Sequence, residues 1–273
     1  MAARRIHLPN ENADFQRLDA LRSNRNLRHR LRLFPVEGVR QLETALSGGW
    51  PIKGLVLPSD RRLSDWARSI VDASAADTHY TLPAALHAKL SNKREASEIV
   101  ALVEIPEDDI GRITLGTPPL VVVFDRPNYP GNLGTLVRSC DALGADGLIV
   151  TGHSADPYDP QAVAASTGSL FALPVVRLRS ARDLEPLLTR IREEYGDLQV
   201  VGTSARAAKL VYECNFWRPT LLLVGNETDG LSHAYADMAD ETIAIPMTGS
   251  ASSLNVACAA TLVLYEAARQ RRG

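Results

Sequence analysis

The hydrophobic and polar positions of this chain follow two different patterns, separated by a stretch rich in proline and glycine at residues 106–119. Before that stretch, helical periodicity mixes with short apolar runs, which predicts a small α/β region. The expected helices are residues 10–22, 38–46, 63–73 and 83–90, and the expected strands are residues 52–57 and 99–104. Because proline and glycine interrupt both patterns, we place the domain boundary in this stretch, with domains of residues 1–112 and 113–273.

After this stretch, short apolar runs alternate regularly with helical segments. The expected strands are residues 120–124, 147–150, 173–178, 199–202, 220–224 and 242–245. The expected helices are residues 132–143, 160–169, 183–195, 232–238 and 254–271. Strands that are apolar on both faces and alternate with helices indicate a parallel sheet covered on both sides. The predicted fold class is therefore α/β, with a parallel sheet in the second domain.

Polar segments directly follow several of these predicted strands. Three are long, at residues 125–134, 225–232 and 246–255, and a milder one lies at residues 203–205. Because parallel strands end at the same edge of a sheet, ligands of such folds bind outside the carboxyl ends of the strands. We therefore expect these segments to form one composite pocket.

The last of these segments runs into a nearly all-apolar helix. A helix that is apolar on every side is normally buried, so Asn255 in its first turn is expected to enter the interior and to find hydrogen-bond partners there. Ser252 or Ser253 is expected to cap the N–H groups at the helix start. The small residues before the helix leave the backbone open to a ligand, so we interpret this segment as part of a site.

Composition excludes several classes of protein. The chain has 273 residues, 45% of them hydrophobic and 23% charged, which is ordinary for a globular protein with a sizeable core. The longest apolar run, residues 254–265, is too short to cross a bilayer, and the start of the chain shows no secretory signal. Cys140, Cys214 and Cys258 form no CxxC pair, and six scattered histidines show no metal-ligand spacing. We therefore expect a cytoplasmic protein without a membrane segment or a metal.

Arginine is concentrated in one segment of the first domain, although the formal net charge is only −2. Between residues 16 and 40 the chain contains Arg17, Arg22, Arg25, Arg28, Arg30, Arg32 and Arg40. Such a patch can neutralise phosphates and makes binding depend on salt, while a solvated helix face is an equally good reading of a lone arginine run. The candidate RNA-binding residues are Arg25, Arg28, Arg30 and Arg32.

The polar segments lack the motifs of several common enzymes. The chain contains no GxxxxGK[ST] phosphate loop, no GxGxxG after a strand and no GxSxG nucleophile elbow, and His153 with Asp156 lies in what reads as an ordinary loop. The segments instead supply asparagine, serine, one arginine, one glutamate and many backbone N–H groups. This chemistry suits methyl transfer from a sulfonium donor, because such a donor already has a good leaving group and catalysis needs mainly positioning and proton removal.

Three ordered motifs in the second domain resemble those of the SpoU (TrmH-type) family. They are Asn132-x-Gly134-x-x-x-Arg138, then Gly225-Asn226-Glu227-x-x-Gly230-Leu231-Ser232, then Ile245-Pro246-Met247 through Ser253-Leu254-Asn255. Members of this family are RNA 2′-O-ribose methyltransferases of the SPOUT superfamily. More loosely, residues 37–40 make the first domain similar to the family's small ribosomal-protein-L30-like substrate-binding domain.

The resemblance implies a trefoil-knotted C-terminal domain that binds S-adenosylmethionine and works as a homodimer. By their positions in the motifs, the residues implied in cofactor binding are Thr203, Gly225, Asn226, Ile245, Met247, Ser253 and Leu254. The residues implied in catalysis are Asn132, Arg138, Glu227, Ser253 and Asn255.

Several questions stay open from the sequence. Arg138 is either the base that accepts the ribose proton or, since a guanidinium almost never deprotonates, a clamp for the target phosphate. The implied substrate is 23S rRNA, with tRNA as an alternative, and a non-catalytic RNA-binding protein of the same fold is a further alternative. The role is either antibiotic resistance or housekeeping modification.

Overall fold

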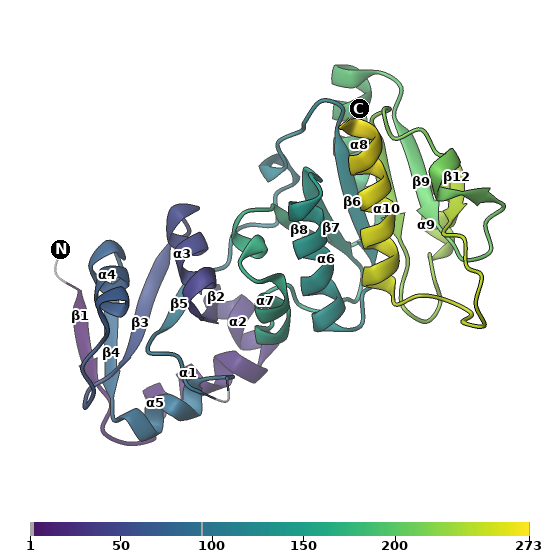
Figure 1. Ribbon diagram of the computed structural model, residues 1–273. Coiled ribbons are helices and arrows are strands. Elements are labelled where there is room, and N and C mark those ends of the chain that lie inside the picture. The colour runs from purple at the N-terminus through teal and green to yellow at the C-terminus, as the bar shows by residue number, and fades with distance from the viewer. Residues whose placement is uncertain (1–2, 94, 273) are drawn as a thin grey trace. The chain divides into compact units, whose positions relative to one another are not determined.

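The computed structural model describes residues 3–93 and 95–272, and its packing divides the chain into two compact units (Figure 1). Unit 1 consists of Met1–Pro106 and Tyr158–Ala172, and unit 2 consists of Glu107–Pro157 and Leu173–Gly273. A segment that we placed in the second domain, Tyr158–Ala172, therefore packs with the first. The domain boundary after residue 112 stays a prediction.

Unit 1 is built on a mixed sheet of five strands in the order β1-β4-β3-β5-β2. The strands are β1 (Arg4–His7), β2 (Leu33–Glu37), β3 (Ile52–Pro58), β4 (Thr78–Leu82) and β5 (Val100–Glu104). The helices are α1 (Ala13–Ser23), α2 (Arg25–Leu31), α3 (Val39–Ser47), α4 (Asp65–Ala73), α5 (Ala84–Leu90), α7 (Pro160–Ser166) and the 3-10 turn η2 (Ser169–Phe171). Strands β1, β4 and β3 are parallel, while β5 runs antiparallel to both β3 and β2.

An aromatic cluster joins Tyr158–Ala172 to the N-terminal part of unit 1. The ring centroids of Phe34 and Tyr158 are 4.9 Å apart, and those of Trp50 and Phe171 are 5.1 Å apart. The indole N–H of Trp50 also donates to the carbonyl oxygen of Phe171 at 3.0 Å. Packed aromatic pairs contribute about 0.5–1.5 kcal/mol each beyond the burial of their surface. Unit 1 is therefore completed by chain that follows the first part of unit 2.

Unit 2 is built on a seven-stranded, all-parallel sheet with the order β10-β12-β9-β11-β6-β7-β8. The strands are β6 (Leu120–Asp125), β7 (Gly147–Thr151), β8 (Val175–Leu178), β9 (Gln199–Thr203), β10 (Lys209–Leu210), β11 (Thr220–Val224) and β12 (Glu241–Ala244). The helices are α6 (Pro130–Ala142), α8 (Glu185–Tyr195), α9 (His233–Met238) and α10 (Val256–Arg271), with 3-10 turns η1 (Ile110–Arg112), η3 (Ala181–Leu184) and η4 (Val211–Glu213). The predicted parallel α/β sheet is confirmed.

Helices cover both faces of this sheet. Val121 and Val123 of β6 pack in one core cluster with Leu187 and Ile191 of α8 and with Tyr235 of α9. Helices α6 and α10 lie side by side elsewhere on the sheet, where the hydroxyls of Ser139 and Thr261 are 2.6 Å apart (Figure 1). Among the described residues, no helix is long and apolar enough to cross a membrane.

The register of the sheet brings the polar segments to one edge. Phe124 of β6 pairs with Val224 of β11, and Leu223 of β11 pairs with Gly202 of β9. The segments that follow these strands therefore start at the same level. The strand order reverses at β6, which is where open α/β sheets bind their ligands. The trefoil knot stays a prediction of the resemblance.

Candidate active site

A chain of side-chain hydrogen bonds connects the three polar loops of unit 2. The Glu227 carboxylate accepts from the side-chain amide of Asn132 at 3.1 Å and from the backbone N–H groups of Asn128 and Tyr129 at 2.9 and 3.3 Å. The side-chain oxygen of Asn132 in turn accepts from the side-chain amide of Asn255 at 3.1 Å. The loops after β6, β11 and β12 each contribute one member, so three of the five candidate catalytic residues meet in one network.

Asn255 occupies a different place from the one we predicted. It is exposed and is itself the N-cap of α10, because its side-chain oxygen accepts from the N–H groups of Ala257 and Cys258. The expectation of burial was wrong, since the helix begins only at Val256 and Asn255 keeps a non-helical backbone, with φ of −52° and ψ of 137°. The expected capping by Ser252 or Ser253 was also wrong, for the same reason. The expectation that Asn255 has hydrogen-bond partners is confirmed.

Arg138 differs from Asn132, Glu227 and Asn255 because its side chain has no hydrogen-bond partner among the described residues. It lies on α6 with an exposed side chain, and it forms no hydrogen bond or ion pair with the part of the chain that the structure describes. A guanidinium held in no internal pair keeps all of its donors available for a phosphate or carboxylate from outside.

The loop after β11 is held in a very tight turn. A Cβ atom at Gly225 would lie 2.4 Å from the carbonyl carbon of Gly230 and 2.5 Å from the nitrogen of Leu231, so only glycine fits there. Asn226 shapes the same turn, since its side-chain oxygen accepts from the N–H groups of Thr228 and Asp229. The Thr203 hydroxyl donates to the carbonyl oxygen of Leu223 at 3.1 Å, which ties the end of β9 to β11.

The loop after β12 presents open backbone. Ile245 is half-buried, whereas Met247, Ser253 and Leu254 are exposed. In the part of the chain that the structure describes, no backbone N–H from residue 247 to residue 254 donates a hydrogen bond to another group of the chain. These N–H groups can therefore serve a bound molecule.

Comparison with known proteins agrees with this arrangement. The sequence profile of the SpoU rRNA Methylase family matches residues 119–265, and that of the SpoU L30e-like domain matches residues 12–101. The chain belongs to the SpoU rRNA methylase family. The motif residues Asn132, Glu227 and Asn255 follow β6, β11 and β12 at one edge of the sheet, and Arg138 lies further along α6.

Individual SpoU relatives are similar over nearly the whole chain. The 23S rRNA (uridine(2479)-2′-O)-methyltransferase of Streptomyces viridochromogenes is 48% identical over 99% of this chain and 93% of its own length. The crystal structure of AviRb from the same organism, in complex with the cofactor AdoMet, has a TM-score of 0.90 at 47% identity and covers 96% of this chain and 99% of its own. An AdoMet-bound rRNA methyltransferase from Sinorhizobium meliloti has a TM-score of 0.84 at 28% identity, covering 97% of this chain and 98% of its own.

Two arginines of the arginine-rich segment, Arg28 and Arg32, are held by hydrogen bonds within unit 1. The Arg28 side chain is 1% exposed and donates to the carbonyl oxygens of Leu21 and Arg22 at 3.0 and 3.2 Å and to Asp159 at 3.3 Å. Arg28 is therefore not available to a phosphate, and this contradicts our expectation for it. Arg32 donates twice to the carbonyl oxygen of Ile105, at 3.2 and 2.9 Å.

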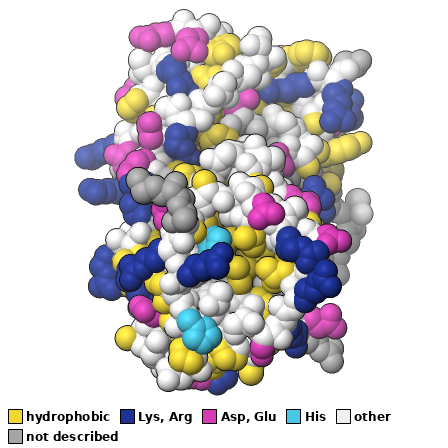
Figure 2. Space-filling model, turned by 90° about the vertical axis from the view of Figure 1, so that its left-hand side faces the viewer, with side chains coloured by type: hydrophobic (Ala, Val, Ile, Leu, Met, Phe, Trp, Pro, Cys, Tyr) yellow, Lys and Arg dark blue, Asp and Glu magenta, His cyan; other side chains and the backbone are white. Residues whose placement is uncertain are grey.

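The other two candidate RNA-binding arginines lie nearer the surface. Arg25 is half-buried and already interacts within the chain, and Arg30 is exposed. On the face drawn in Figure 2, lysine and arginine side chains are interspersed with aspartate and glutamate. Among the residues that the structure describes, this face therefore shows no continuous stripe of basic side chains.

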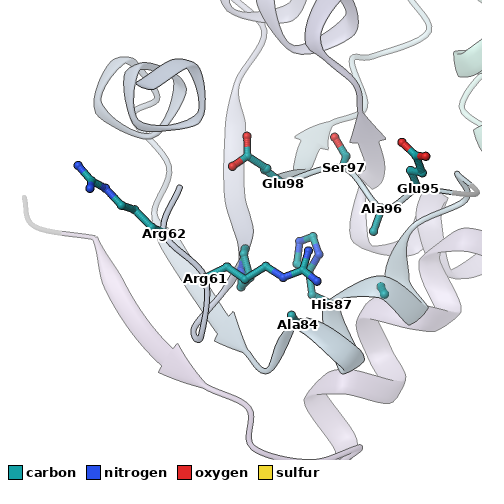
Figure 3. Close-up of a pocket in the computed structure, with 10 residues that line it drawn as sticks. Arg61, Arg62, Ala84, His87, Glu95, Ala96, Ser97 and Glu98 are labelled. Carbon is teal, nitrogen blue, oxygen red and sulfur yellow. The ribbon is translucent and has the colours of Figure 1, made fainter. Parts of the chain in front are cut away.

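Unit 1 contains a cavity of about 470 Å³ beside the end of β3. Its lining includes Arg61, Arg62, His87, Glu95 and Glu98, and Figure 3 shows the Arg61 side chain extending toward the His87 ring. The Glu98 carboxylate accepts from the N–H and the hydroxyl of Ser64, the residue that caps α4, at 2.9 and 2.6 Å. Burial lowers the pKa of His87, whose Nε2 lies 3.2 Å from a β3 carbonyl oxygen. Two arginines and two glutamates balance in charge, so the cavity favours neither an anion nor a cation.

The sequence patterns missed two residues beside the active site, Asp125 and Arg126. Asp125 is 2% exposed at the end of β6, and its carboxylate accepts from Nε and Nη2 of Arg126, both at 3.1 Å. The hydrogen bond to Asp125 raises the pKa of Arg126. Their place in the first polar segment was visible, but the left-handed backbone of Arg126, with φ of 51°, leaves no sequence signal.

Proposed function

We propose that this protein transfers a methyl group from S-adenosylmethionine to a ribose 2′-hydroxyl of RNA, with 23S rRNA as the substrate. The observation that carries the proposal is the network of Glu227, Asn132 and Asn255, together with the exposed Arg138 of α6, whose guanidinium has no partner among the described residues. Similarity over the whole length to a 23S rRNA 2′-O-methyltransferase supports the choice of RNA.

The residues of unit 2 fit S-adenosylmethionine. Gly225 leaves no room for a side chain in the turn after β11, and the N–H groups of residues 247–254 are open to a ligand. Such a set of main-chain donors and acceptors suits an adenosine and an amino-acid group. By their place on these loops, Thr203, Gly225, Asn226, Ile245, Met247, Ser253 and Leu254 would hold the cofactor. The cofactor supplies a methyl group on a sulfonium sulfur, which is a good leaving group.

The chain's own contribution is positioning. Glu227 fixes the Asn132 amide and the backbone at Asn128, so that the start of α6 has a defined shape. Arg138 acts as a phosphate clamp that orients the target ribose, because a guanidinium is a strong hydrogen-bond donor with no acceptor and so is poorly suited to take a proton. The hydroxyl proton would leave to a substrate phosphate or to water as the oxygen–carbon bond forms and the sulfur–carbon bond of the donor breaks, which would release a neutral thioether. Orientation of this kind contributes several kcal/mol to catalysis in enzymes generally.

A direct assay tests the proposal. The purified protein is incubated with S-adenosylmethionine labelled in its methyl group and with 23S rRNA or tRNA in separate reactions. We expect label in 23S rRNA at one nucleotide, resistant to alkaline hydrolysis because the 2′-hydroxyl is blocked. Label in tRNA alone would replace 23S rRNA by the alternative substrate. Cofactor and RNA binding without transfer of label to either RNA would favour a non-catalytic RNA-binding protein.

We further propose that the protein is a homodimer. Leu262 and Tyr265 of α10 are 44% and 58% exposed, and Cys258 is exposed on the same helical stripe. Exposed apolar stripes of this kind mark interfaces between proteins. Analytical ultracentrifugation should give twice the mass of the monomer. The double variant Leu262→Glu, Tyr265→Glu should have the mass of the monomer. The control Glu193→Arg, on an exposed position of α8, should leave the mass unchanged.

We propose three further properties of the protein. Unit 1 binds the RNA substrate, as the match to the SpoU L30e-like domain supports. The protein works in the cytoplasm, where its free cysteines Cys140, Cys214 and Cys258 stay reduced. The modification serves antibiotic resistance, and comparing drug sensitivity and rRNA methylation in cells with and without the gene tests this role against housekeeping.

A further inference from the structure

Arg126 adopts a backbone conformation that arginine rarely takes. Its φ of 51° lies in the left-handed region, which costs energy in any residue with a side chain. Residues held in such conformations persist where surrounding contacts fix them, and they often mark functional sites. The contacts of Arg126 therefore need an explanation that the catalytic network does not supply.

Those contacts reach across from the end of β6 to the loop after β11. Nη2 of Arg126 donates to the carbonyl oxygen of Gly230 at 3.3 Å, and the carbonyl oxygen of Arg126 accepts from the side-chain amide of Asn226 at 2.7 Å. The buried Asp125 carboxylate pairs with the same guanidinium and accepts from the N–H of Ser232 at 2.8 Å. We call Asp125 and Arg126 the β6 clamp.

The β6 clamp holds the loop on both sides of Glu227. Its contacts fall on Asn226, directly before Glu227, and on Gly230 and Ser232, three and five residues after it. A bidentate carboxylate–guanidinium pair fixes direction as well as distance, so both ends of the turn are set by one rigid group. The turn itself contains Gly225 and Asn226, which the proposed function assigns to the cofactor.

Room for the Arg126 side chain is built into the neighbouring loop. A Cβ atom at Gly152, directly after β7, would lie 2.8 Å from Cγ of Arg126. Gly152 also has a φ of +67°, so a side chain there is strained in any case. The backbone of Arg126 is anchored as well, since its N–H donates to the carbonyl oxygen of Thr151 at 3.1 Å.

We infer that the β6 clamp is a positioning device that keeps residues 225–232 in the shape that binds S-adenosylmethionine. Arg126 acts through the loop and is a positioning residue. The inference rests on the proposed cofactor but not on the proposed RNA. It predicts that cofactor affinity depends on the Arg126 side chain, whereas the chemical step at saturating cofactor depends on it much less.

The test measures binding of S-adenosylmethionine to the full-length variants by calorimetry. We expect Arg126→Ala to raise the Kd about tenfold, the effect of losing one well-made charged contact, and Arg126→Lys to raise it less. Arg126→Gly separates contacts from strain, because glycine relieves the left-handed backbone but supplies no guanidinium. It should bind as weakly as Arg126→Ala, with thermal stability at least equal to that of the alanine variant.

A matched control removes a similar ion pair elsewhere in unit 2. Arg177 of β8 pairs with Asp108 through Nε and Nη2 at 3.0 and 2.6 Å, and Arg177→Ala should leave the Kd for the cofactor unchanged. In steady-state assays, Arg126→Gly should raise KM for the cofactor with kcat within about twofold, a split that general loss of folded protein would not produce.

Two outcomes overturn the inference. One is wild-type cofactor affinity in Arg126→Gly, since the side chain would then have no role in shaping the loop. The other is a wild-type protein that does not bind S-adenosylmethionine, which overturns the proposed function as well. If the wild type binds the cofactor but methylates no RNA, the proposed substrate fails, while the Kd values of the variants still decide the inference.

Discussion

Arg28 in unit 1 and Arg138 in unit 2 were both expected to meet RNA, and the structure treats them in opposite ways. Arg28 is 1% exposed and its guanidinium is occupied by two backbone carbonyls and Asp159. Arg138 is exposed and has no partner among the described residues. The availability of an arginine thus depends on the acceptors that the fold places around it.

The surroundings of the two helices explain this difference. Helix α1 ends only two residues before α2 begins, so the chain turns a tight corner and leaves the carbonyl oxygens of Leu21 and Arg22 without helical partners. Arg28 reaches back to supply those partners. Arg138 is exposed on α6, and no such acceptor reaches it there.

Removing Arg138 should give the largest effect on function. We expect Arg138→Ala to lower methyl transfer by at least about 100-fold, because positioning of the substrate contributes this much in comparable enzymes. The cofactor Kd and the melting temperature should stay near the wild-type values, since the Arg138 side chain forms no hydrogen bond or ion pair with the described residues. Arg138→Lys is the matched variant, which keeps the charge without the bidentate donors. Near-wild-type turnover of Arg138→Ala would remove this arginine from the mechanism.

Removing Arg28 should instead give the largest effect on stability. We expect Arg28→Ala to lower the free energy of unfolding by about 3 kcal/mol, because it leaves buried carbonyl oxygens and Asp159 without their donor. Urea unfolding measures this loss. Arg30→Ala, at an exposed position on the same helix, is the control and should change stability by less than about 0.5 kcal/mol. A small loss for Arg28→Ala would show that its contacts are not needed for folding.

The exposed Arg30 of α2 should give a smaller effect on RNA binding. We expect Arg30→Ala to weaken RNA affinity a few-fold and to reduce the slope of log K against log salt by about 1, as for the loss of one phosphate contact. Filter binding at several salt concentrations measures both quantities. An unchanged affinity and slope, also in the double variant with Arg25→Ala, would exclude this helix from the RNA interface.

The pH dependence of stability should be the smallest effect, and we expect it from His87 of unit 1. Burial lowers the pKa of His87 from its usual value of 6.5, although the hydrogen bond to Val56 and the charge of Glu37 act in the opposite direction. The unfolded chain therefore binds a proton more readily, and stability should fall as pH drops below about 6.5, by at most about 1.4 kcal/mol per pH unit. Urea unfolding at pH 7.5 and 5.5 checks this, and the fall should be smaller in His87→Gln.

Elements with strong apolar patterns could be predicted from the sequence. Strand β6 and helix α10 lie within one or two residues of their expected places, because each buries a continuous or periodic set of apolar side chains. Strand β1 carries almost no buried residue, and β2 contains Pro35, so neither shows a strand pattern. Both strands form because a neighbouring strand offers hydrogen-bond partners, and a local pattern does not contain that information.

Part of the candidate site could likewise be predicted from the sequence, and part of it could not. The motifs identified Asn132, Glu227 and Asn255, and the structure joins them by direct hydrogen bonds. Asn255 is exposed because of where α10 begins. Arg28 is held in internal hydrogen bonds because of the carbonyl oxygens that lie near it. Those facts come from the packing of distant segments, so residue types and spacing alone could not supply them.

The packing of Phe171 against Trp50 has a consequence for synthesis on the ribosome. These residues are 121 positions apart in the chain, so β2 and β3 leave the ribosome long before the aromatic side chains that complete their core. The nascent protein must carry an open apolar surface on unit 1 while β6, α6 and β7 are being made. A stalled or truncated chain ending near residue 112 would keep that surface exposed and should be a preferred client of chaperones and proteases.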